Sequence, residues 1–463
     1  MIDVASFRDR PIAVMGLGRS GLATAEALLA SGARLAAWDD GEAQRDAATA
    51  RGIPLTDLGR FDWAGVDTLV LSPGIPHRHP APHPVAAAAR AAGASIVSDI
   101  ELLFRSRPAA GFVGITGTNG KSTTTALIGH ILGAAGRDIE AGGNLGPPAL
   151  AMRPLDSDAF YVLELSSYQL ERMPSVVFDV AVLLNISPDH LDRHGDMEGY
   201  VTAKARIFEG QSVGQTAIVG VDDDHSRLIY DPLRARRVGG VVPIAVGRPV
   251  PGGVYVLDGE LIDDVTGGSA GGLDLRDLPR LPGSHNWQNA AAAYAACRAV
   301  GIAPGIIAAA IATFPGLPHR MERIAEIDGV TFVNDSKATN ADAAEKALLC
   351  HDDIYWIAGG RAKAGGIAAL AAHFDRIAHA YLIGEAAGDF AETLAGRTPY
   401  TLSPDLPTAI RAAHARAIAD RRSGAVVLLS PAAASFDQFA DFEARGEVFR
   451  ATVHALDTGE AAS

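Results

Sequence analysis

The sequence predicts an α/β protein made of three domains. A glycine-rich turn follows a short apolar strand near residue 16, a second glycine-rich loop follows another strand near residue 117, and strands alternate with helices again after residue 315. Such alternation is typical of parallel sheets whose two faces are covered by helices. We therefore expect a Rossmann-like domain at 1–108, a central parallel sheet of the P-loop ATPase kind at 109–314 and a second Rossmann-like domain at 315–463.

The bulk composition is that of a soluble globular protein of several domains. Apolar residues make up 48% of the 463 residues and charged residues 20%, and a chain of this length exceeds one core. The net charge of −14 argues against nucleic-acid or membrane partners. Cys297 and Cys350 lie far apart without metal-ligand spacing, which favours a reducing compartment. With no signal-peptide pattern and no apolar run of ~18 residues, we expect a cytoplasmic protein, and a monomer.

The first segment has the pattern of a dinucleotide-binding unit. An apolar strand at 12–15 runs into Gly-Leu-Gly-Arg-Ser-Gly at 16–21, a helix follows at 22–31, and a strand at 34–38 ends at Asp39. The glycines let the backbone approach a diphosphate, and the helix N-terminus faces its charge. The pattern indicates a diphosphate site without saying which diphosphate binds. Further strands are expected at 68–71 and 96–97, and the linker at 108–110.

A phosphate-binding loop opens the second segment. Residues 114–122, Gly-Ile-Thr-Gly-Thr-Asn-Gly-Lys-Ser, follow a strand and precede a helix. Backbone N–H groups of such a loop surround phosphate oxygens. Lys121 would neutralise phosphate charge, and Ser122 would bind Mg²⁺. Ile115 stands where the strict G-x-x-x-x-G-K-[ST] pattern has its first glycine, so a glycine-rich turn with a chance Lys-Ser is the alternative interpretation.

Polar residues also end two later strands of this segment. Glu164 lies at the end of a strand at 160–165, and Asp189 and His190 follow a strand at 180–184. Open α/β sheets bind ligands at the carboxyl ends of their strands. Glu164 is therefore placed for a metal ion. A lone histidine is more often a surface residue, but the position of His190 favours a functional role.

The remaining pattern completes the expected fold. A hairpin with an Asp258-Gly259 turn is expected at 254–261, then a surface loop at 266–272 and an Ala-rich helix at 286–300. A second doubly wound sheet is expected in the third segment. Its predicted strands are 331–333, 354–358, 380–383 and 425–429.

Several motifs, in order along nearly the whole chain, resemble those of the Mur ligases of bacterial cell-wall synthesis. They are Gly117-Thr118-Asn119-Gly120-Lys121-Ser122, Glu164-Leu165-Ser166-Ser167, Asn185 with Asp189-His190, Tyr200-Val201-Thr202-Ala203-Lys204, His319-Arg320 and Asn334-Asp335-Ser336-Lys337-Ala338-Thr339-Asn340. The last of these, with 430–439 and 442–446, is similar to the D-glutamate-adding members of the family; members that add L-alanine or diaminopimelate have a Tyr-Ala-His motif there.

This resemblance implies an ATP-dependent amide ligase of peptidoglycan precursor synthesis. Its substrates would be UDP-N-acetylmuramoyl-L-alanine, D-glutamate and ATP, with an acyl-phosphate intermediate. The resemblance further implies two Mg²⁺ ions, and a carbamate formed on Lys204 from CO₂. That reaction needs a neutral amine, which burial favours. The implied catalytic residues are Lys121, His190 and Lys204, and the implied metal ligands are Ser122, Glu164, His190 and Lys204.

The resemblance also assigns the three substrate sites. The implied ATP-binding residues are Gly117, Thr118, Asn119, Gly120, Lys121, Ser122, Thr123, Asn286, Asn289, Arg320, Asp335 and Lys337. Those for the UDP-linked substrate are Gly18, Arg19, Ser20, Asp39, Ser72, Gly74, Asn144 and His190. Those for D-glutamate are Thr339, Lys363, Ser435 and Phe442. Two positions depart from the family pattern: Arg361 stands where relatives often have an acidic residue, and Ala433 where they often have cysteine.

Three other functions share some of these features. The turn at 16–21 with Asp39 is also typical of an NAD-dependent oxidoreductase, in which the loop at 114–122 would have no role. A P-loop switch or motor would use that loop and Glu164, but it does not need a third α/β domain with its own Lys and Arg residues. A folylpolyglutamate synthase is the nearest enzyme alternative, and it would not need the first glycine-rich domain.

Overall fold

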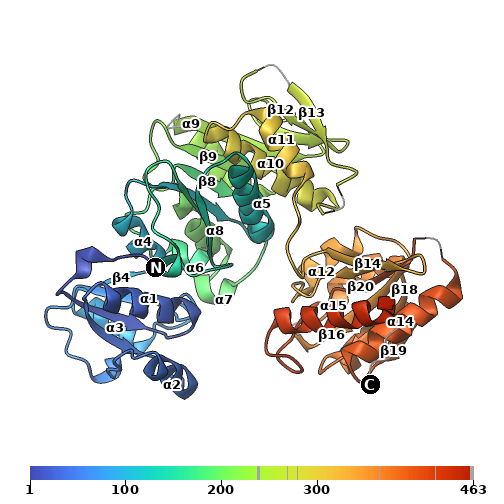
Figure 1. The fold of residues 1–463 in the computed structure, drawn as a ribbon, viewed down its shortest axis with the longest axis horizontal. Helices are drawn as coiled ribbons and strands as arrows, with labels where there is room; N and C mark the ends of the chain where they lie inside the picture. Colours follow the sequence, from blue (N-terminus) through green and yellow to red (C-terminus); the bar gives the residue numbers. More distant parts are fainter. Residues whose placement is uncertain (237–239, 268–269, 279, 364, 423, 459–463) are drawn as a thin grey trace. The chain divides into compact units, whose positions relative to one another are not determined.

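The computed structural model describes residues 1–236, 240–267, 270–278, 280–363, 365–422 and 424–458 (Figure 1). Contacts group the chain into two units. The N-terminal unit comprises Met1–Asp274 and Trp287–Thr313, and the C-terminal unit comprises Leu275–Asn286 and Phe314–Ser463. The predicted α/β class is confirmed, whereas the predicted domain boundaries at 108 and 314 stay predictions.

The first sheet of the N-terminal unit is parallel. Its strand order is β2-β1-β3-β4. The strands are β1 (Pro11–Met15), β2 (Arg34–Trp38), β3 (Thr68–Leu71) and β4 (Ser95–Val97), and the helices are α1 (Arg19–Ala30), α2 (Glu42–Ala50), α3 (Pro84–Ala91) and α4 (Asp99–Ser106). Met15 pairs with both Trp38 and Leu71. The glycine turn, Asp39 and Ser72 therefore start from one edge of this sheet.

The central sheet of the same unit has the order β13-β12-β11-β10-β9-β8-β5-β7-β6. Its strands are β5 (Gly111–Thr116), β6 (Ile139–Gly143), β7 (Phe160–Glu164), β8 (Val180–Leu183), β9 (Thr216–Gly220), β10 (Gly240–Val246), β11 (Val254–Leu257), β12 (Glu260–Asp263) and β13 (Ala270–Asp274). The sheet is parallel from β6 to β11, and β12 and β13 add antiparallel pairs. Because Ile115 pairs with Glu164 and Thr116 with Leu183, the phosphate loop begins between the ends of β7 and β8.

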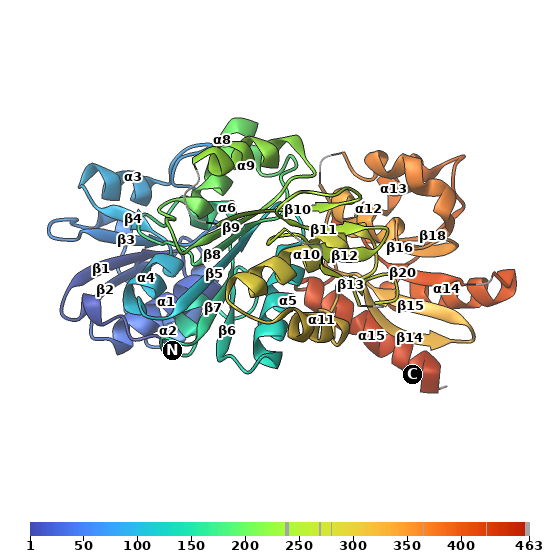
Figure 2. The same ribbon diagram turned by 90° about the horizontal axis from the view of Figure 1, so that it is seen from above.

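Helices cover both faces of the central sheet. Figure 2 shows α8 and α9 on one side and α5, α10 and α11 on the other. The helices are α5 (Lys121–Ala134), α6 (Ser167–Leu170), α7 (Leu191–His194), α8 (Met197–Ala205), α9 (Asp224–Arg236), α10 (Ser284–Ala299) and α11 (Pro304–Ala312). This arrangement explains why the central strands read as continuous apolar runs.

The prediction of a surface loop at 266–272 is wrong for the second half of this segment. Residues 268 and 269 lie outside the described residues, but β13 starts at Ala270 and pairs antiparallel with β12. Glycine-rich segments have low strand propensity, so the sequence favours a loop here. Pairing with the edge of β12 makes this segment a strand, although its intrinsic strand propensity is low. The neighbouring hairpin is confirmed, with Asp258 and Gly259 both at positive φ.

The C-terminal unit contains a mostly parallel sheet with the order β14-β15-β20-β16-β18-β19, in which only β14 among the described strands runs antiparallel to its neighbour. The strands are β14 (Glu322–Ile327), β15 (Val330–Asn334), β16 (Ile354–Gly359), β18 (Ile377–Ile383), β19 (Tyr400–Leu402) and β20 (Val426–Leu429). The helices are α12 (Ala341–Leu348), α13 (Ala387–Leu394), α14 (Leu406–Asp420) and α15 (Phe442–Thr458). A short pair, β17 (Arg361–Ala362) and β21 (Ala433–Ala434), lies beside it.

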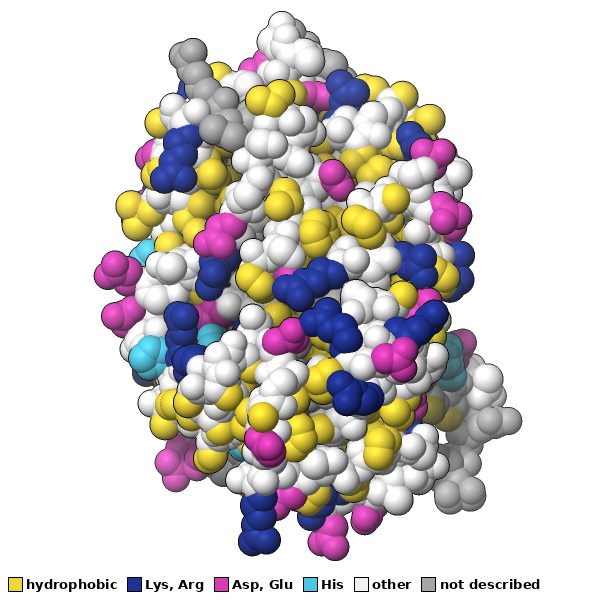
Figure 3. Space-filling view, turned by 90° about the vertical axis from the view of Figure 1, so that its left-hand side faces the viewer, with side chains coloured by type: hydrophobic (Ala, Val, Ile, Leu, Met, Phe, Trp, Pro, Cys, Tyr) yellow, Lys and Arg dark blue, Asp and Glu magenta, His cyan; other side chains and the backbone are white. Residues whose placement is uncertain are grey.

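Two apolar clusters cover the opposite faces of this C-terminal sheet. One joins Trp356 and Phe390 with α12 and α13, and the other joins Phe332 and Phe449 with α14 and α15. This is the doubly wound arrangement predicted from the sequence. Among the described residues, no helix is both long and apolar enough to cross a membrane. Figure 3 shows acidic and basic side chains intermixed on the face that it displays.

Candidate active site

The loop between β5 and α5 is held in a phosphate-loop shape by its neighbours. Gly117 has φ +158° and Gly120 φ +85°, backbone conformations that favour glycine. The Thr118 N–H donates to the Asn185 carbonyl at 2.9 Å, and the Asn119 N–H donates to Asn185 Oδ1 at 2.9 Å. The segment after β8 therefore fixes the loop, and α5 starts directly at Lys121.

Two lysines converge on one carbonyl of this loop. Lys121 Nζ donates to the Gly117 oxygen at 3.0 Å and to the Thr118 oxygen at 2.7 Å. Lys204 Nζ donates to the same Gly117 oxygen at 2.8 Å. Lys204, from α8, is 1% exposed. Burial, and next the charge of Lys121, hold the pKa of Lys204 well below its ordinary value. A neutral amine is therefore favoured at the position where a nucleophilic amine is predicted.

Glu164 lies beside the loop, at the end of β7. It is 3% exposed, and its Oε1 accepts a hydrogen bond from Asn144 Nδ2 at 2.7 Å. Its Oε2 is buried and has no hydrogen-bond partner among the described residues. A carboxylate oxygen left in this state fits a hard cation. Ser122, on the adjacent helix start, is also buried and offers a hydroxyl. These residues fit Mg²⁺ held together with phosphate oxygens and water, the usual coordination of that ion.

No cluster of three or more His, Cys, Asp or Glu side chains with metal-site spacing occurs in the described part of the chain. A magnesium ion bound by one or two protein ligands does not require one. His190 lies at the start of α7 with φ +53° and is exposed. Its ring lies 5.2 Å from that of Tyr168, and its Nε2 is 3.4 Å from Asp189 Oδ2. His190 thus lies on the surface, next to Tyr168 and Asp189.

The residues predicted for the UDP-linked substrate surround the first glycine turn. Asp39 accepts from the Leu17 N–H at 2.6 Å and from the Gly41 N–H at 2.8 Å. Its carboxylate thereby fixes the turn itself, a structural role that the sequence pattern does not reveal. Ser72 Oγ donates to the Gly16 carbonyl at 2.9 Å. Gly18, Arg19 and Gly74 are exposed and Ser20 is half-buried on this edge of the sheet.

Arg19 and Asn144 connect the two sheets of the N-terminal unit. The Arg19 guanidinium donates to the Asn144 carbonyl at 3.2 Å. Asn144 in turn binds Glu164 through its side chain and donates its own N–H to the Glu164 carbonyl at 2.9 Å. The predicted diphosphate turn is therefore joined to the predicted metal ligand through one asparagine.

In the C-terminal unit, Asp335 lies at the end of β15. Asn334 pairs with Leu429 of β20, which brings Asp335 next to Ser430. Ser430 Oγ donates to Asp335 Oδ2 at 2.9 Å, and the Met321 N–H donates to Oδ1 at 3.2 Å. Burial raises the pKa of Asp335 to about 7. A carboxyl group in this environment titrates close to neutral pH.

Of the residues predicted for D-glutamate, Phe442 lies on a segment that contacts Ser336. Ser336 Oγ donates to the Phe442 carbonyl at 2.8 Å, and Lys337 Nζ lies 3.7 Å from the centre of the Phe442 ring. Ser435 is buried, Thr339 is half-buried and Lys363 is exposed. The structure thus connects the 334–340 and 442–446 motifs directly.

Arg361, the departure from the family pattern, has a partner of its own. In β17 it donates to both carboxylate oxygens of Glu385, at 3.1 and 3.0 Å. Both side chains are more than half exposed, so the ion pair contributes little stability. Ala433, the second departure, is fully buried in β21, which pairs with β17.

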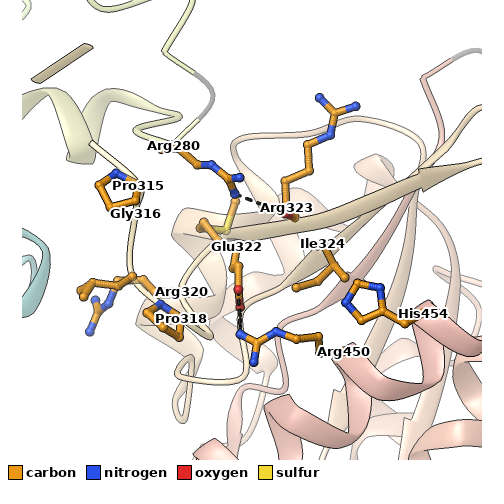
Figure 4. A pocket seen from close by; sticks show the side chains of 12 residues that line it. Arg280, Pro315, Gly316, Pro318, Arg320, Glu322, Arg323, Ile324, Arg450 and His454 are labelled. Atoms are coloured by element: carbon orange, nitrogen blue, oxygen red, sulfur yellow. Dashed lines mark hydrogen bonds and ion pairs between the residues drawn. The ribbon is translucent and has the colours of Figure 1, made fainter. Parts of the chain in front are cut away.

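Arg320 lines a pocket of about 410 Å³ within the C-terminal unit. Figure 4 shows that the arginines around it point in different directions. Arg450 donates to both oxygens of Glu322, at 2.7 and 3.0 Å, and Arg280 donates to the Arg323 carbonyl at 3.2 Å. These side chains therefore do not converge on a single ligand position.

The two asparagines predicted to contact adenine are both buried. Asn286 Nδ2 donates to the Pro282 carbonyl at 2.7 Å in the C-terminal unit. Asn289 Oδ1 accepts from Thr124 Oγ1 at 3.3 Å in the N-terminal unit. Asn289 also lies so close to Gly120 that a Cβ there would be 2.2 Å from its oxygen. In the structure, Asn289 packs against the phosphate loop at Gly120. Its contact with adenine stays a prediction.

Sequence reasoning assigned no role to several buried side chains that build the site. Tyr200 places its hydroxyl 3.1 Å from Thr118 Oγ1. Arg445 is buried and donates to Ser336 Oγ at 3.0 Å and to the Ser336 carbonyl at 2.8 Å. Arg172 is buried against the first sheet. Charged residues are rarely buried, so the sequence gives no signal that two arginines belong to the interior.

Comparisons with known proteins place the chain among the enzymes that its motifs resemble. A family model described as the Mur ligase middle domain matches residues 115–297, and one described as the glutamate ligase domain of Mur ligases matches 319–433. A UDP-N-acetylmuramoylalanine–D-glutamate ligase from Rhodospirillum rubrum is 52% identical over 468 residues, covering 100% of this chain and 98% of that protein.

A second relative of the same name, from Phenylobacterium zucineum, is 53% identical over 468 residues, with 100% of this chain and 99% of that protein covered. Among solved structures, a UDP-N-acetylmuramate–alanine ligase from Thermotoga maritima matches with a TM-score of 0.58 at 16% identity, covering 97% of this chain and 100% of the other. At that identity the match shows the fold.

Proposed function

The chain belongs to the Mur ligase family, and from this membership we propose that it joins D-glutamate to UDP-N-acetylmuramoyl-L-alanine with hydrolysis of ATP, in peptidoglycan precursor synthesis. The full-length identity of 52–53% to proteins that carry this name supports the choice of amine. The observation on which the chemistry rests is the convergence of Lys121 and Lys204 on the Gly117 carbonyl, beside the open oxygen of Glu164.

The reaction must overcome the poor reactivity of a carboxylate towards an amine. A carboxylate oxygen of the alanyl group attacks the γ-phosphorus of ATP, which forms an acyl phosphate and releases ADP. The neutral amine of D-glutamate then attacks the acyl carbon. The tetrahedral intermediate collapses with loss of inorganic phosphate, and the amine gives up a proton. Several anions must meet in this sequence, so positioning and charge neutralisation are the main contributions of the protein.

The phosphate loop supplies most of that positioning. Backbone N–H groups of 117–122 and the start of α5 would bind the β- and γ-phosphates, with Lys121 exchanging its loop carbonyls for phosphate oxygens. We propose that Ser122 and Glu164 hold one Mg²⁺ and that His190 contributes to a second. When bound, these ions neutralise phosphate charge. Glu164 keeps its orientation through Asn144.

Lys204 is proposed to react with CO₂ to form a carbamate that contributes to magnesium binding. The step joins the amine nitrogen to the carbon of CO₂ and releases one proton, so it needs the amine in its neutral form. The burial of Lys204 supports that form, because a charged ammonium is disfavoured away from water. The carbamate returns a negative charge to a site whose nearby lysine and phosphate-binding backbone are electropositive.

The substrate residues keep the assignments that the family resemblance gave them. Gly18, Arg19, Ser20, Asp39, Ser72 and Gly74 are proposed for the UDP group, and Asn144 with His190 for the muramoyl-alanine end. Arg320, Asp335 and Lys337, with Asn286 and Asn289, are proposed for ATP. Thr339, Lys363, Ser435 and Phe442 are proposed for D-glutamate. The contacts among Ser336, Lys337 and Phe442 support a common location for the last two groups.

The proposal is tested by measuring ADP release with UDP-N-acetylmuramoyl-L-alanine, ATP and a panel of amino acids. The expected result is turnover with D-glutamate and none with L-glutamate, L-alanine or diaminopimelate. Turnover of unsubstituted UDP-N-acetylmuramic acid with L-alanine would instead place the chain in another branch of the family. Equal ADP release without any amino acid would support a simple ATPase.

A further inference from the structure

Arg172 is an internal cation that clamps a loop of the first sheet. It follows α6 and is 1% exposed. Its Nη1 donates to the Leu71 carbonyl at 2.8 Å and to the Ser72 carbonyl at 3.1 Å, and its Nη2 donates to the Pro73 carbonyl at 3.2 Å. Three consecutive carbonyls, of the last residue of β3 and the first two residues after it, therefore bind one guanidinium.

Arg172 makes two further hydrogen bonds, one through its side chain and one through its main chain. Nε donates to the Tyr168 carbonyl within α6 at 2.9 Å, and the Arg172 carbonyl accepts from the Ser98 N–H at 2.8 Å. A second arginine acts on the same loop: Arg193 donates to the Gly74 carbonyl at 2.9 Å and stacks on the Tyr168 ring at 4.5 Å. The loop at 71–74 is thus fixed from α6 and α7.

A series of hydrogen bonds connects Arg172 to both predicted substrate sites. The clamped residue Ser72 holds the Gly16 carbonyl of the glycine turn. From that turn, Arg19 reaches Asn144, and Asn144 binds Glu164. Glu164 ends β7, and α6 with Arg172 follows it closely in the chain. The diphosphate turn is therefore tied to the metal-ligand strand by two routes, one through Asn144 and one through Arg172.

The chemistry of the clamp requires arginine. A planar guanidinium carries five donors in fixed directions and can bind several carbonyls at once, whereas a lysine ammonium is a compact point charge. Burial lowers the pKa of Arg172 to about 10, so the group stays charged at neutral pH. A buried charge is costly unless its donors are satisfied. The Arg172 contacts are stable only while the carbonyls of 71–73 stay in place, which restricts this segment to one conformation.

We propose that Arg172 is a positioning residue for the UDP-linked substrate, which sets the loop 71–74 and the glycine turn relative to Glu164. This inference rests on the proposed function. It assigns Arg172 no contact with substrate. Its removal would loosen the diphosphate-binding edge of the first sheet while leaving the phosphate loop at 114–122, which has its own supports in Asn185 and Asn289, unchanged.

The test is steady-state kinetics of Arg172→Met and Arg172→Lys with each substrate varied. We expect the KM for the UDP-linked substrate to rise about tenfold or more, the equivalent of one lost charged hydrogen bond, and the KM for ATP to stay within about twofold. Arg172→Ala should regain part of the lost affinity when guanidinium ion is added at low millimolar concentration, and none with methylammonium.

Arg376→Met is a control in the C-terminal unit, because that guanidinium also donates to a carbonyl, of His351 at 3.2 Å, as well as to Asp352 at 2.8 Å. It should leave both KM values unchanged. If Arg172 variants do not fold, Arg193→Gln tests the same loop through Gly74 and should shift the same KM in the same direction.

Equal changes in both KM values, or normal kinetics with only a lower melting temperature, would overturn the positioning role. Failure of the wild-type protein to couple D-glutamate would instead refute the proposed function.

Discussion

At the scale of single residues, Lys204 differs most from what its surroundings in the sequence suggest. In a helix between polar and small residues, a lysine is ordinarily exposed, yet this one is 1% exposed and donates to the Gly117 carbonyl. The resemblance to the Mur ligases predicted a special role for Lys204. No local sequence pattern did so. The structure supplies the physical condition, a buried amine, that carbamate formation needs.

Replacing this amine should abolish most activity. We expect Lys204→Ala to lose at least about 100-fold in kcat, because charge stabilisation of this kind contributes a few kcal/mol, and acetate or propionate to restore part of it by occupying the vacated space. The measurement is ADP release with and without added carboxylate. Lys346→Ala is the control: this more exposed lysine pairs with Glu345, and its loss should leave kcat unchanged. Full activity of unsupplemented Lys204→Ala would refute the role.

Asp335 gives a prediction about pH and stability. Its pKa is raised to about 7 by burial, above the ordinary 3.8, so the folded protein holds this proton more tightly than the unfolded chain. The resulting stabilisation is complete below about pH 4 and is lost as the pH rises to about 7. The loss amounts to at most about 4 kcal/mol for a shift of this size.

Asp335→Asn cannot titrate, so its stability should fall less than that of the wild type between pH 5 and pH 8. Urea unfolding of the ligand-free proteins at both pH values measures the difference. Identical pH dependence of the two proteins would show that Asp335 ionises in the folded state as it does in the unfolded one.

At the scale of elements, two glycines, one in the phosphate loop and one just after the helix that follows it, are needed for different reasons. At Gly120 the φ of +85° is combined with a lack of space, because a Cβ would lie 2.2 Å from Asn289 Oδ1. At Gly136, just after α5, φ is +76° and a Cβ would meet no atom within 4 Å. A substitution at Gly136 therefore tests backbone strain alone, whereas one at Gly120 tests backbone strain together with steric exclusion.

Gly120→Ala should therefore raise the KM for ATP or lower kcat by about 100-fold, because Asn289 and the loop must both move and a displacement of about 1 Å has an effect of this size. Gly136→Ala should lower stability by about 1 kcal/mol, the usual energy of a non-glycine residue at positive φ, without changing kinetics. Equal kinetic effects of the two changes would show that the supports around Gly120 do not matter for nucleotide binding.

Much of the element pattern was predictable because it depends on local sequence. The strands at 12–15, 34–38 and 68–71, the phosphate loop and the Asp258-Gly259 hairpin all lie where periodicity and turn residues indicate. β13 could not be predicted, because its glycines favour a loop and only pairing with β12 makes it a strand. The roles of Arg172 and Arg445 were also hidden, since their partners are backbone carbonyls and a hydroxyl distant in sequence.

At the scale of the whole molecule, each parallel sheet places its candidate residues at the carboxyl ends of its strands. Asp39 and Ser72 follow β2 and β3. Glu164 is the last residue of β7, Asn185 comes shortly after β8, and Asp335 follows β15. Motif order along the chain predicted this placement, because parallel strands align their carboxyl ends. Family membership likewise followed from motif spacing. Side-chain contacts between the two sheets of the N-terminal unit could not be predicted in this way, since they depend on packing.

The central claim, that the alanyl carboxylate is activated by phosphorylation before the amide forms, is tested most directly by oxygen transfer. UDP-N-acetylmuramoyl-L-alanine labelled with ¹⁸O in its carboxylate is incubated with ATP and D-glutamate, and the released phosphate is examined by mass spectrometry. We expect one ¹⁸O atom in the inorganic phosphate for each amide bond formed, because the acyl phosphate passes its bridging oxygen to phosphate. Phosphate without ¹⁸O, accompanied by normal amide formation, would contradict the claim.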